Sequence, residues 1–457
     1  MTFKHGKHIL QLAIPSMVEN ILQMLMGMVD SYLVAQVGLL AVSGVSLATN
    51  IITIYQALFI ALGSAISSLI ARSLAENNPD KHQKYISDAL LITLLLSLGF
   101  GVISLFFGQK VLEVLGADRV LAQTGSLYLA IVGGMIVSLG LLTSLGAIVR
   151  AQGDAKLPMQ VSLVTNIINA ILSTLAIYSF GLGLIGVAWA TVISRFVGIM
   201  ILLQKVPLKG LVKHFSFRLD QEMLNLSLPA AGERLMMRLG DVLIVMIIVR
   251  LGTKVLAGNA IGETISQFNY MPGMAIATAT IILVARQYGQ ENYSDIQELI
   301  KEVFLLSTII MLALSLITFL LGPLVSSLFT NDPQALKASM IVLLFSLVCA
   351  PATAGTLVYT ALWQGLGNAR LPFYATTVGM WLVRIVLGYV LAIWCNLGLT
   401  GVWLATGLDN GSRWLILASC FKRYNRRIAI KKNNKIPIIT LIHEMMRFVV
   451  GILQCHK

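Results

Sequence analysis

Two carboxylates interrupt an apolar segment close to the N-terminus. Glu19 and Asp30 lie within residues 12–34, a run long enough to cross a bilayer as a helix of about 20 residues. A helix turns about 100° per residue, so the two carboxylates are about three turns and about 16 Å apart along the axis. The same helical stripe contains two intervening residues, Gln23 and Met26.

Ionisable groups at membrane depth are costly and usually face the interior of a helix bundle or an aqueous cavity. The stripe of Glu19 and Asp30 therefore predicts a site for a cation or a proton beside a transport path. A structural carboxylate that is hydrogen-bonded inside the bundle is the alternative.

Other apolar segments also contain charged residues. The acids are Glu233, Asp241, Glu263 and Asp409, and the arginines are Arg195, Arg234, Arg238, Arg384 and Arg413. So many charges are costly for a purely structural bundle, and they favour transport of ions or charged solutes. Asp409 and Arg413 are one turn apart, which predicts a structural ion pair. Arg234 and Arg238 share a face with Asp241, and they either line a cavity or form a structural cluster.

Amide and hydroxyl side chains recur at one-turn spacing in the fifth apolar segment, at Asn166, Asn169 and Ser173. Such groups can coordinate a cation or hydrogen-bond a protonated acid. They can equally hold neighbouring helices together. We expect them to line the transport cavity together with Gln23, Met26, Arg234 and Arg238.

The composition places these groups in a membrane protein. Of 457 residues, 57% are hydrophobic and only 12% are charged, about half the charged fraction of a soluble domain. The apolar runs are continuous rather than alternating, which predicts helices and excludes a barrel. The net charge of +13 lies mainly in short loops and the tail, as the positive-inside rule requires, so no nucleic-acid partner is expected.

Apolar windows separated by polar loops predict about twelve membrane-spanning helices, some long enough to tilt. Their approximate bounds are 9–37, 41–72, 85–108, 122–149, 157–180, 183–205, 223–250, 256–286, 299–321, 335–364, 371–394 and 397–421. Lys and Arg concentrate in the N-terminus, in the loops after even-numbered spans and in the tail. We therefore expect a multi-pass protein of the cell membrane with both termini in the cytoplasm.

The two halves of the chain resemble each other at a nearly constant offset. Pro15 and Glu19 match Pro229 and Glu233, and Arg72 matches Arg286. The loop that ends at Pro158 matches the one that ends at Pro372, and residues 182–191 match 397–406. Each half has six spans, an even number, so both halves insert in the same sense. This predicts two parallel repeats around a central cavity, with the path between them.

The repeat divides the chain into a six-helix lobe over residues 1–206, a basic cytoplasmic linker over 207–222 and a second six-helix lobe over 223–421. Residues 422–457 form a tail that is first basic and then apolar. Its second part, 436–455, is compatible with an interfacial helix against anionic lipid, and less so with a thirteenth span.

No enzyme signature is present: the chain has no Walker loop, no HExxH motif and no nucleotide fingerprint. The four cysteines have neither disulfide-framework nor zinc spacing. We therefore expect a secondary transporter without a cofactor.

The residues quoted above resemble the multidrug and toxic compound extrusion (MATE) family. The resemblance is carried by the runs from Pro15 to Gly38 and from Pro229 to Gly252, by residues 271–279, and by the ARSLAENN and RAQGDAKLP loops. It extends over residues 9–421. What the resemblance implies is cation-coupled antiport of drugs and other, mostly cationic, organic compounds out of the cell. Asp30 matches the family's first-span aspartate and Glu233 its seventh-span glutamate.

Two departures from the family pattern concern the coupling ion. Ser173 stands where many members carry an aspartate, and the tenth span has no acid where some sodium-coupled members have one. The resemblance thus favours proton coupling, with Na⁺ at Asp30 or Glu233 left open and no firm metal site.

The expected mechanism is alternating access. Protonation of Asp30, with Glu19 and Glu233 as further coupling residues, or Na⁺ binding there, competes with substrate for the same negative charge. We expect the protein to work as a monomer among membrane lipids on small organic molecules. One alternative is a lipid-linked oligosaccharide flippase of the same broad superfamily: Arg234, Arg238 and Arg384 are compatible with it, whereas the acids Glu19, Asp30 and Glu233 argue against it. A non-transporting scaffold or receptor is another.

Overall fold

A computed structural model describes residues 4–207 and 220–434, with side chains as far as residue 426. All regular structure in these ranges is helical, which confirms the predicted all-α membrane fold. The first half contains α1 (Gly6–Ala35), α2 (Leu39–Ala75), α3 (Pro79–Val114), α4 (Arg119–Tyr128), the π-helical segment η1 (Leu129–Gly133), α5 (Val137–Gln152), α6 (Lys156–Tyr178) and α7 (Gly183–Leu203).

The second half follows the same plan. It contains α9 (Gln221–Val249), α10 (Thr253–Gly289), α11 (Tyr293–Ser327), α12 (Pro333–Val348), α13 (Ala350–Gly365), α14 (Arg370–Val378), the π-helical segments η2 (Gly379–Leu387) and η3 (Val390–Trp394), and α15 (Gly398–Asn434). Of the predicted linker 207–222, the last two residues already belong to α9, and α15 continues through the basic start of the tail. The predicted interfacial helix over 436–455 lies outside the described residues.

Local sequence explains where several helices begin and end. Asn78 and Asp332 cap α3 and α12, each followed by a proline in the first helical turn. The matching loops between the fourth and fifth spans of each half use the same turn. Gly153 has φ of 109° and Gly367 has φ of 83°, and the next residue, Asp154 or Asn368, accepts a hydrogen bond from a backbone N–H three residues on.

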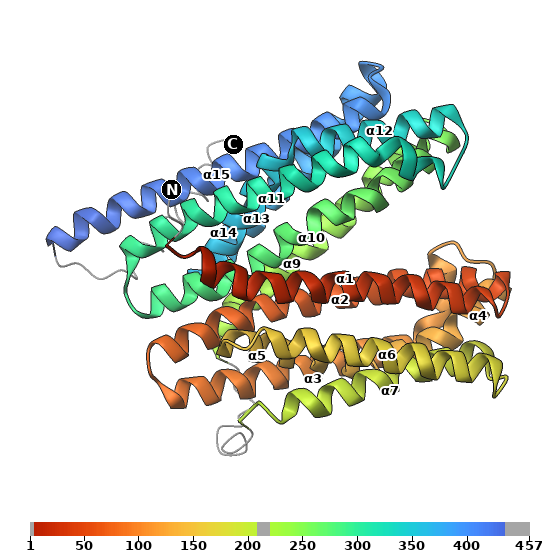
Figure 1. The fold of residues 1–457 in the computed structure, drawn as a ribbon, viewed down its shortest axis with the longest axis horizontal. Helices are drawn as coiled ribbons and strands as arrows, with labels where there is room; N and C mark the ends of the chain where they lie inside the picture. Colours follow the sequence, from red (N-terminus) through yellow and green to blue (C-terminus); the bar gives the residue numbers. More distant parts are fainter. Residues whose placement is uncertain (1–3, 208–219, 435–457) are drawn as a thin grey trace.

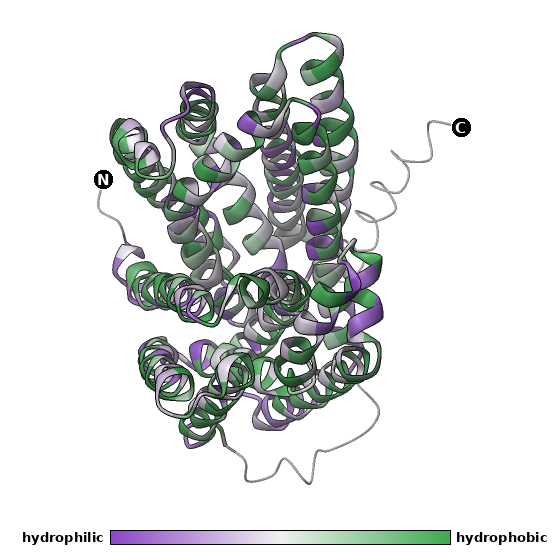
Figure 2. Cartoon of the chain, turned by 90° about the vertical axis from the view of Figure 1, so that its right-hand side faces the viewer, coloured by the Kyte–Doolittle hydropathy of each residue, from purple (hydrophilic) through white to green (hydrophobic). Residues whose placement is uncertain are grey.

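Eight helices are long and apolar enough to cross a membrane, and two bent pairs, α4–η1 with α5 and α12 with α13, bring the number to ten in the described residues. The remaining two helices of the bundle, α9 and α15, carry charged residues along their length. The apolar windows of α3 and α11 are only 33% and 22% buried, so these helices face lipid. Hydrophobic colouring runs along most of the bundle (Figure 2).

The helices form two lobes (Figure 1). We call α1–α7 the N-terminal lobe and α9–α15 the C-terminal lobe. The lobes diverge toward the end where α4 and α12 lie, and they converge at the opposite end. The helices α2 and α10 are 72% and 61% buried over their apolar windows, and α2 packs against both α9 and α10. The two lobes therefore meet along α2 and α10.

Polar contacts close the converging end. The Arg72 guanidinium lies 5.0 Å from the ring centroid of Tyr288, and Arg286 Nη2 donates to the Ala151 carbonyl over 2.9 Å. The backbones approach closely here, because a Cβ on Gly289 would lie 2.8 Å from the Arg72 carbonyl oxygen. Arg72 and Arg286 are equivalent in the repeat, so each half contributes one arginine that contacts the other half.

Candidate functional site

The first-span aspartate of the N-terminal lobe is held by α6. Asn169 Nδ2 lies 3.4 Å from both carboxylate oxygens of Asp30, and Ser173 Oγ donates to Asn169 Oδ1 over 3.0 Å. Asn169 and Ser173 are buried, whereas Asp30 is half-buried. One helical turn thus aligns an amide and a hydroxyl behind the carboxylate, as the sequence spacing predicts.

A half-buried arginine accompanies this group. Arg195 of α7 interacts electrostatically with Asp30 and with Tyr128, and its Nη1 has no hydrogen-bond partner within the described residues. Asn166, in contrast, donates to the Leu22 carbonyl over 2.9 Å and so fastens α6 to α1. The described neighbourhood of Asp30 therefore consists mainly of hydrogen-bond donors.

The other carboxylate of the stripe, Glu19, has a cationic partner. Arg150 Nη1 at the end of α5 lies 2.7 Å from Glu19 Oε2, and both side chains are mostly buried. In the sequence, Arg150 is one of the basic residues that follow even-numbered spans, and nothing there links it to Glu19. In the structure it lies at the end of α5, within reach of α1. The role of Glu19 in coupling stays a prediction.

The C-terminal lobe repeats this arrangement without the cation. Gln364 Nε2 lies 3.4 Å from Glu233 Oε2, and Thr376 donates to Glu233 Oε1 over 3.0 Å. The pairs Glu19–Arg150 and Glu233–Gln364 both span 131 residues, so the repeat places equivalent residues opposite each other. Glu233 is only 4% exposed and has uncharged hydrogen-bond donors where Glu19 has a guanidinium. Neither Glu19 nor Glu233 is among the lining residues of the cavity in the C-terminal lobe.

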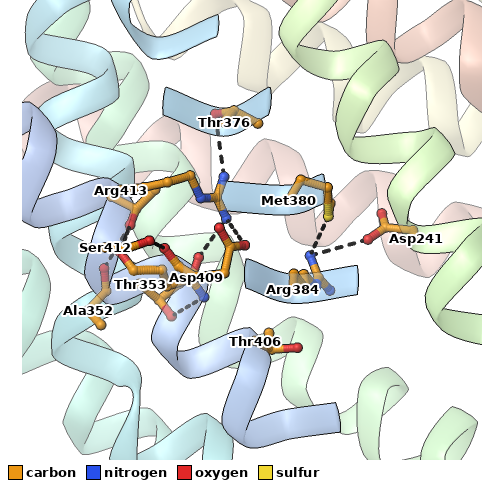
Figure 3. A network of polar contacts seen from close by, with 12 residues as sticks. Asp241, Ala352, Thr353, Thr376, Met380, Arg384, Thr406, Asp409, Ser412 and Arg413 are labelled. Atoms are coloured by element: carbon orange, nitrogen blue, oxygen red, sulfur yellow. Dashed lines mark hydrogen bonds and ion pairs between the residues drawn. The ribbon is translucent and has the colours of Figure 1, made fainter. Parts of the chain in front are cut away.

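A second buried network lies on α15 (Figure 3). Arg413 Nη2 is 2.8 Å from Asp409 Oδ2 and also 2.8 Å from Asn410 Oδ1, and its Nη1 reaches toward the Thr376 hydroxyl at 3.5 Å. Both charged side chains are almost fully buried. The Thr376 hydroxyl therefore contacts both Glu233 and Arg413. A change in the charge of Glu233 can affect Arg413 through this hydroxyl, and the same holds in the other direction.

A cavity of about 570 Å³ occupies the C-terminal lobe at mid-depth, on the side away from the converging end. Its wall comes from α9, α10, α11, α15, η2 and the α12–α13 break, and four residues of α2 close it from the N-terminal lobe. Its charged lining residues are Arg234, Arg238, Asp241, Glu263, Arg384 and Arg413.

The cavity contains part of the predicted lining set. Arg234 and Arg238 line it, whereas Gln23, Met26, Asn166, Asn169 and Ser173 belong to the N-terminal lobe and are not among its lining residues. Asp241 pairs with Arg384 of η2 at 3.4 Å rather than with Arg238 on its own helix (Figure 3). The π-helical turns of η2 bring Arg384 there, and no periodicity in the sequence signals them.

One further cluster lies outside the bundle centre. His5, Asp295 and Glu298 are close enough together to hold a metal ion, but Lys4 Nζ already lies 2.7 Å from Asp295 Oδ1. The backbone N–H groups of Lys4 and His5 also donate to Glu302, at 2.9 and 2.8 Å. The cluster thus fastens the start of α1 to α11, and the ammonium serves as its cation.

The sequence profile of the MatE family matches residues 15–175 and 229–390, one match in each half. A probable multidrug resistance protein NorM of Thermotoga maritima is 28% identical over 425 residues, which cover 88% of this chain and 89% of that protein. An uncharacterized transporter YisQ of Bacillus subtilis is 24% identical over 92% of this chain and 94% of its own length.

Solved structures share the fold. A crystal structure of MATE in the straight conformation superposes with a TM-score of 0.85 at 22% identity, over 93% of this chain and 97% of that chain. A transporter of the MOP superfamily from Pyrococcus furiosus, described as having a binding pocket of reverse polarity, superposes with a TM-score of 0.81 at 21% identity, over 93% of this chain and 96% of that chain. At these identities the likeness concerns the fold alone.

Proposed function

The chain belongs to the MatE family of secondary membrane transporters, and from this premise we propose that it exports organic compounds, cationic ones among them, in exchange for a cation. The observation that carries the proposal is Asp30: a half-buried carboxylate in a membrane helix, backed by Asn169 and without an ion-pair partner among the described residues at salt-bridge distance. A charge left in such a place is costly unless it binds something during the cycle.

The proposed coupling ion is the proton. A sodium ion needs several oxygen ligands, whereas Asp30 accepts from the Asn169 amide N–H and interacts electrostatically with the Arg195 guanidinium and with Tyr128. The Asn169 oxygen is already engaged by Ser173. Glu233 is likewise surrounded by donors, from Thr376 and Gln364. Such donors stabilise an ionised carboxylate, and their interaction with it weakens when a proton neutralises the carboxylate.

Exchange follows if proton and substrate favour opposite conformations. A ligand shifts a conformational equilibrium only by its difference in affinity for the two states. Protonation of Asp30, with Glu233 and Glu19 as further coupling residues, removes the negative charge that an organic cation needs. The protein acts as a monomer in the cell membrane, with both termini and the converging end of the lobes on the cytoplasmic side.

Substrate-triggered proton movement in proteoliposomes tests the proposal. Ethidium is added to vesicles of purified wild-type protein that contain a pH-sensitive dye, and the experiment is repeated with a sodium gradient. We expect internal pH to change with wild type and the change to vanish with Asp30→Asn. Glu113→Gln is the matched control, since this exposed carboxylate at the end of α3 accepts a hydrogen bond from Gln109 and from no other side chain that the structure describes.

The outcomes separate the candidates. Sodium-dependent transport without proton movement would reverse the choice of ion, and transport that is unchanged in both Asp30→Asn and Glu233→Gln would point to a scaffold or receptor. Absence of any flux would favour a lipid-linked oligosaccharide flippase. That second candidate is favoured by the arginines of the cavity, which suit phosphate, and a lipid-linked sugar translocation assay is its direct test.

A further inference from the structure

The cavity of the C-terminal lobe has an unequal charge balance. Four arginines line it, against the two acids Asp241 and Glu263. An organic cation alone gains little from such a lining, because guanidinium groups repel it. What such a cavity can bind therefore depends on which of these charges the protein itself neutralises.

Two of the four arginines have acidic partners. Arg413 is paired with Asp409 at 2.8 Å, and Arg384 is paired with Asp241 at 3.4 Å. The second pair is loose, and Arg384 Nε is buried without a hydrogen-bond partner within the described residues. A donor of Arg384 thus remains unsatisfied beside the cavity.

The other two arginines lie one turn apart on α9. Arg234 is half-buried and Arg238 is exposed to the cavity, and neither makes a hydrogen bond or ion pair with any residue that the structure describes. The neighbouring acid Glu233 attracts Arg234 electrostatically, but its carboxylate oxygens are directed to Thr376 and Gln364. Two guanidinium groups therefore share a water-accessible wall with no acid at hydrogen-bond distance.

We propose that Arg234 and Arg238, with the free donor of Arg384, bind an anionic group, a carboxylate or a phosphate, of the transported compound. A guanidinium presents paired N–H donors that match the oxygens of either group. Aromatic and thioether side chains of the same cavity, from Tyr270, Met274 and Phe345, provide an apolar wall for the rest of the molecule. The inference rests on the proposed function, since it specifies the class of compound that the exporter accepts.

The site also has acids for a positive group. Glu263 lines the cavity, and Asp241 is 40% exposed because Arg384 engages it from one side only. A zwitterion can therefore place its anionic end on α9 and its cationic end toward Asp241 and Glu263. The compounds that bind best are amphiphiles with a carboxylate or phosphate, rather than cations without one.

Matched fluorescent probes measure this preference directly. Rhodamine 19 carries a free carboxylate and rhodamine 6G is its ethyl ester, so the pair differs by one anionic charge. Riboflavin 5′-phosphate and riboflavin form the corresponding phosphate pair. Binding is measured by fluorescence anisotropy with purified full-length protein in phosphatidylcholine nanodiscs, without any ion gradient.

Neutral variants of equal length test the arginines. We expect Arg234→Gln and Arg238→Gln to weaken the anionic member of at least one pair by about tenfold or more, the cost of a lost charge-assisted hydrogen bond, and its partner by less than about threefold. We expect Arg238→Lys, which keeps the positive charge but not the paired N–H donors of the guanidinium, to give an intermediate loss of affinity. Arg250→Gln is the control, because Arg250 directly follows the last residue of α9, lies outside the cavity and stacks on Tyr389.

Equal loss for both members of each pair, or no loss for either, would overturn the proposal. Nanodiscs that contain phosphatidylglycerol identify the source of the anion: displacement of rhodamine 19 by this lipid in wild type but not in Arg238→Gln supports the site and assigns it to a lipid headgroup. The binding assay needs no ion coupling, so it is independent of the flux assay. The preference for anionic compounds can be refuted while proton exchange at Asp30 is confirmed, and proton exchange can be refuted while the preference is confirmed.

Discussion

At the scale of single residues, the two halves differ most at one equivalent position. Arg150 neutralises Glu19, whereas Gln364 leaves Glu233 with uncharged donors. Equivalent carboxylates of the two lobes therefore lie in different electrostatic surroundings.

Replacement of Arg150 tests how much the Glu19–Arg150 ion pair contributes to stability. Arg150→Gln leaves Glu19 mostly buried without its cation, and we expect the free energy of unfolding to fall by about 3 kcal/mol. The thermal midpoint in detergent, followed by intrinsic fluorescence, measures the loss. The double variant Glu19→Gln with Arg150→Gln should recover most of it, since no charge is then left unpaired. A double variant as unstable as the single one would contradict this reading.

At the scale of elements, α2 and α10 hold the converging end closed. The contacts of Arg72 with Tyr288 and of Arg286 with the Ala151 carbonyl each cross the lobe boundary. Opening this end breaks both, so they bias the equilibrium between the two access states.

Replacement of both arginines should open this end more often. In a protein whose native cysteines are replaced, we expect a maleimide to label Ser68→Cys about thirtyfold faster when Arg72 and Arg286 are alanine, since each of the two contacts contributes about 1 kcal/mol. Ser68 is buried there and donates to the Gln364 carbonyl. Arg119→Ala at the opposite end is the control, and an unchanged labelling rate would show that the arginines do not hold the end closed.

The contribution of the junction between α1 and α11 to stability depends on pH. The Lys4 ammonium donates to Asp295 and lowers the pKa of this carboxylate, which lies in the first turn of α11 ahead of its apolar part. A lowered pKa in the folded state stabilises the protein above the unfolded pKa of about 3.9, and the contribution is lost as pH falls through the folded value.

We therefore expect Asp295→Asn to lower the thermal midpoint slightly at pH 7 and to have no effect well below pH 4, relative to wild type at each pH. Glu298→Gln is the comparison, because its carboxylate is 3.6 Å from Lys4 Nζ and 63% exposed, so its effect should be smaller. A difference that persists in acid would show that Asp295 acts through packing instead.

At the scale of the whole molecule, the lobes meet at the end that bears both the start of α1 and the far end of α15 (Figure 1). The cavity lies beyond this contact, toward the diverging end. With the orientation that the basic loops predict, this is an outward-facing arrangement.

A native cysteine reports the side from which the cavity is reached. Cys349 lines the cavity at the break between α12 and α13. In a variant that retains only this cysteine, we expect a membrane-impermeant sulfonated thiosulfonate to modify it from outside intact cells, and bound substrate to slow the reaction at least about threefold by covering it. Modification only from inside-out vesicles would reverse the orientation or the access state.

The sequence alone determined the class of fold and much of its plan. Hydropathy windows and charge bias are local or summed properties, so they predicted the helical spans, and matching sequence runs at a constant offset predicted the repeat. One-turn spacing likewise placed Asn169 and Ser173 in line and Arg413 beside Asp409.

Only the tertiary structure decided which charges meet. Arg150 reaches Glu19 and Arg384 reaches Asp241 because helices far apart in the chain pack together, and the second contact also depends on the π-helical turns of η2. Helical periodicity specifies which side chains share a face, but packing determines what that face contacts. The cavity in the C-terminal lobe follows from that packing, as does the position of Arg234 and Arg238 there without a hydrogen-bond partner in the described part of the chain.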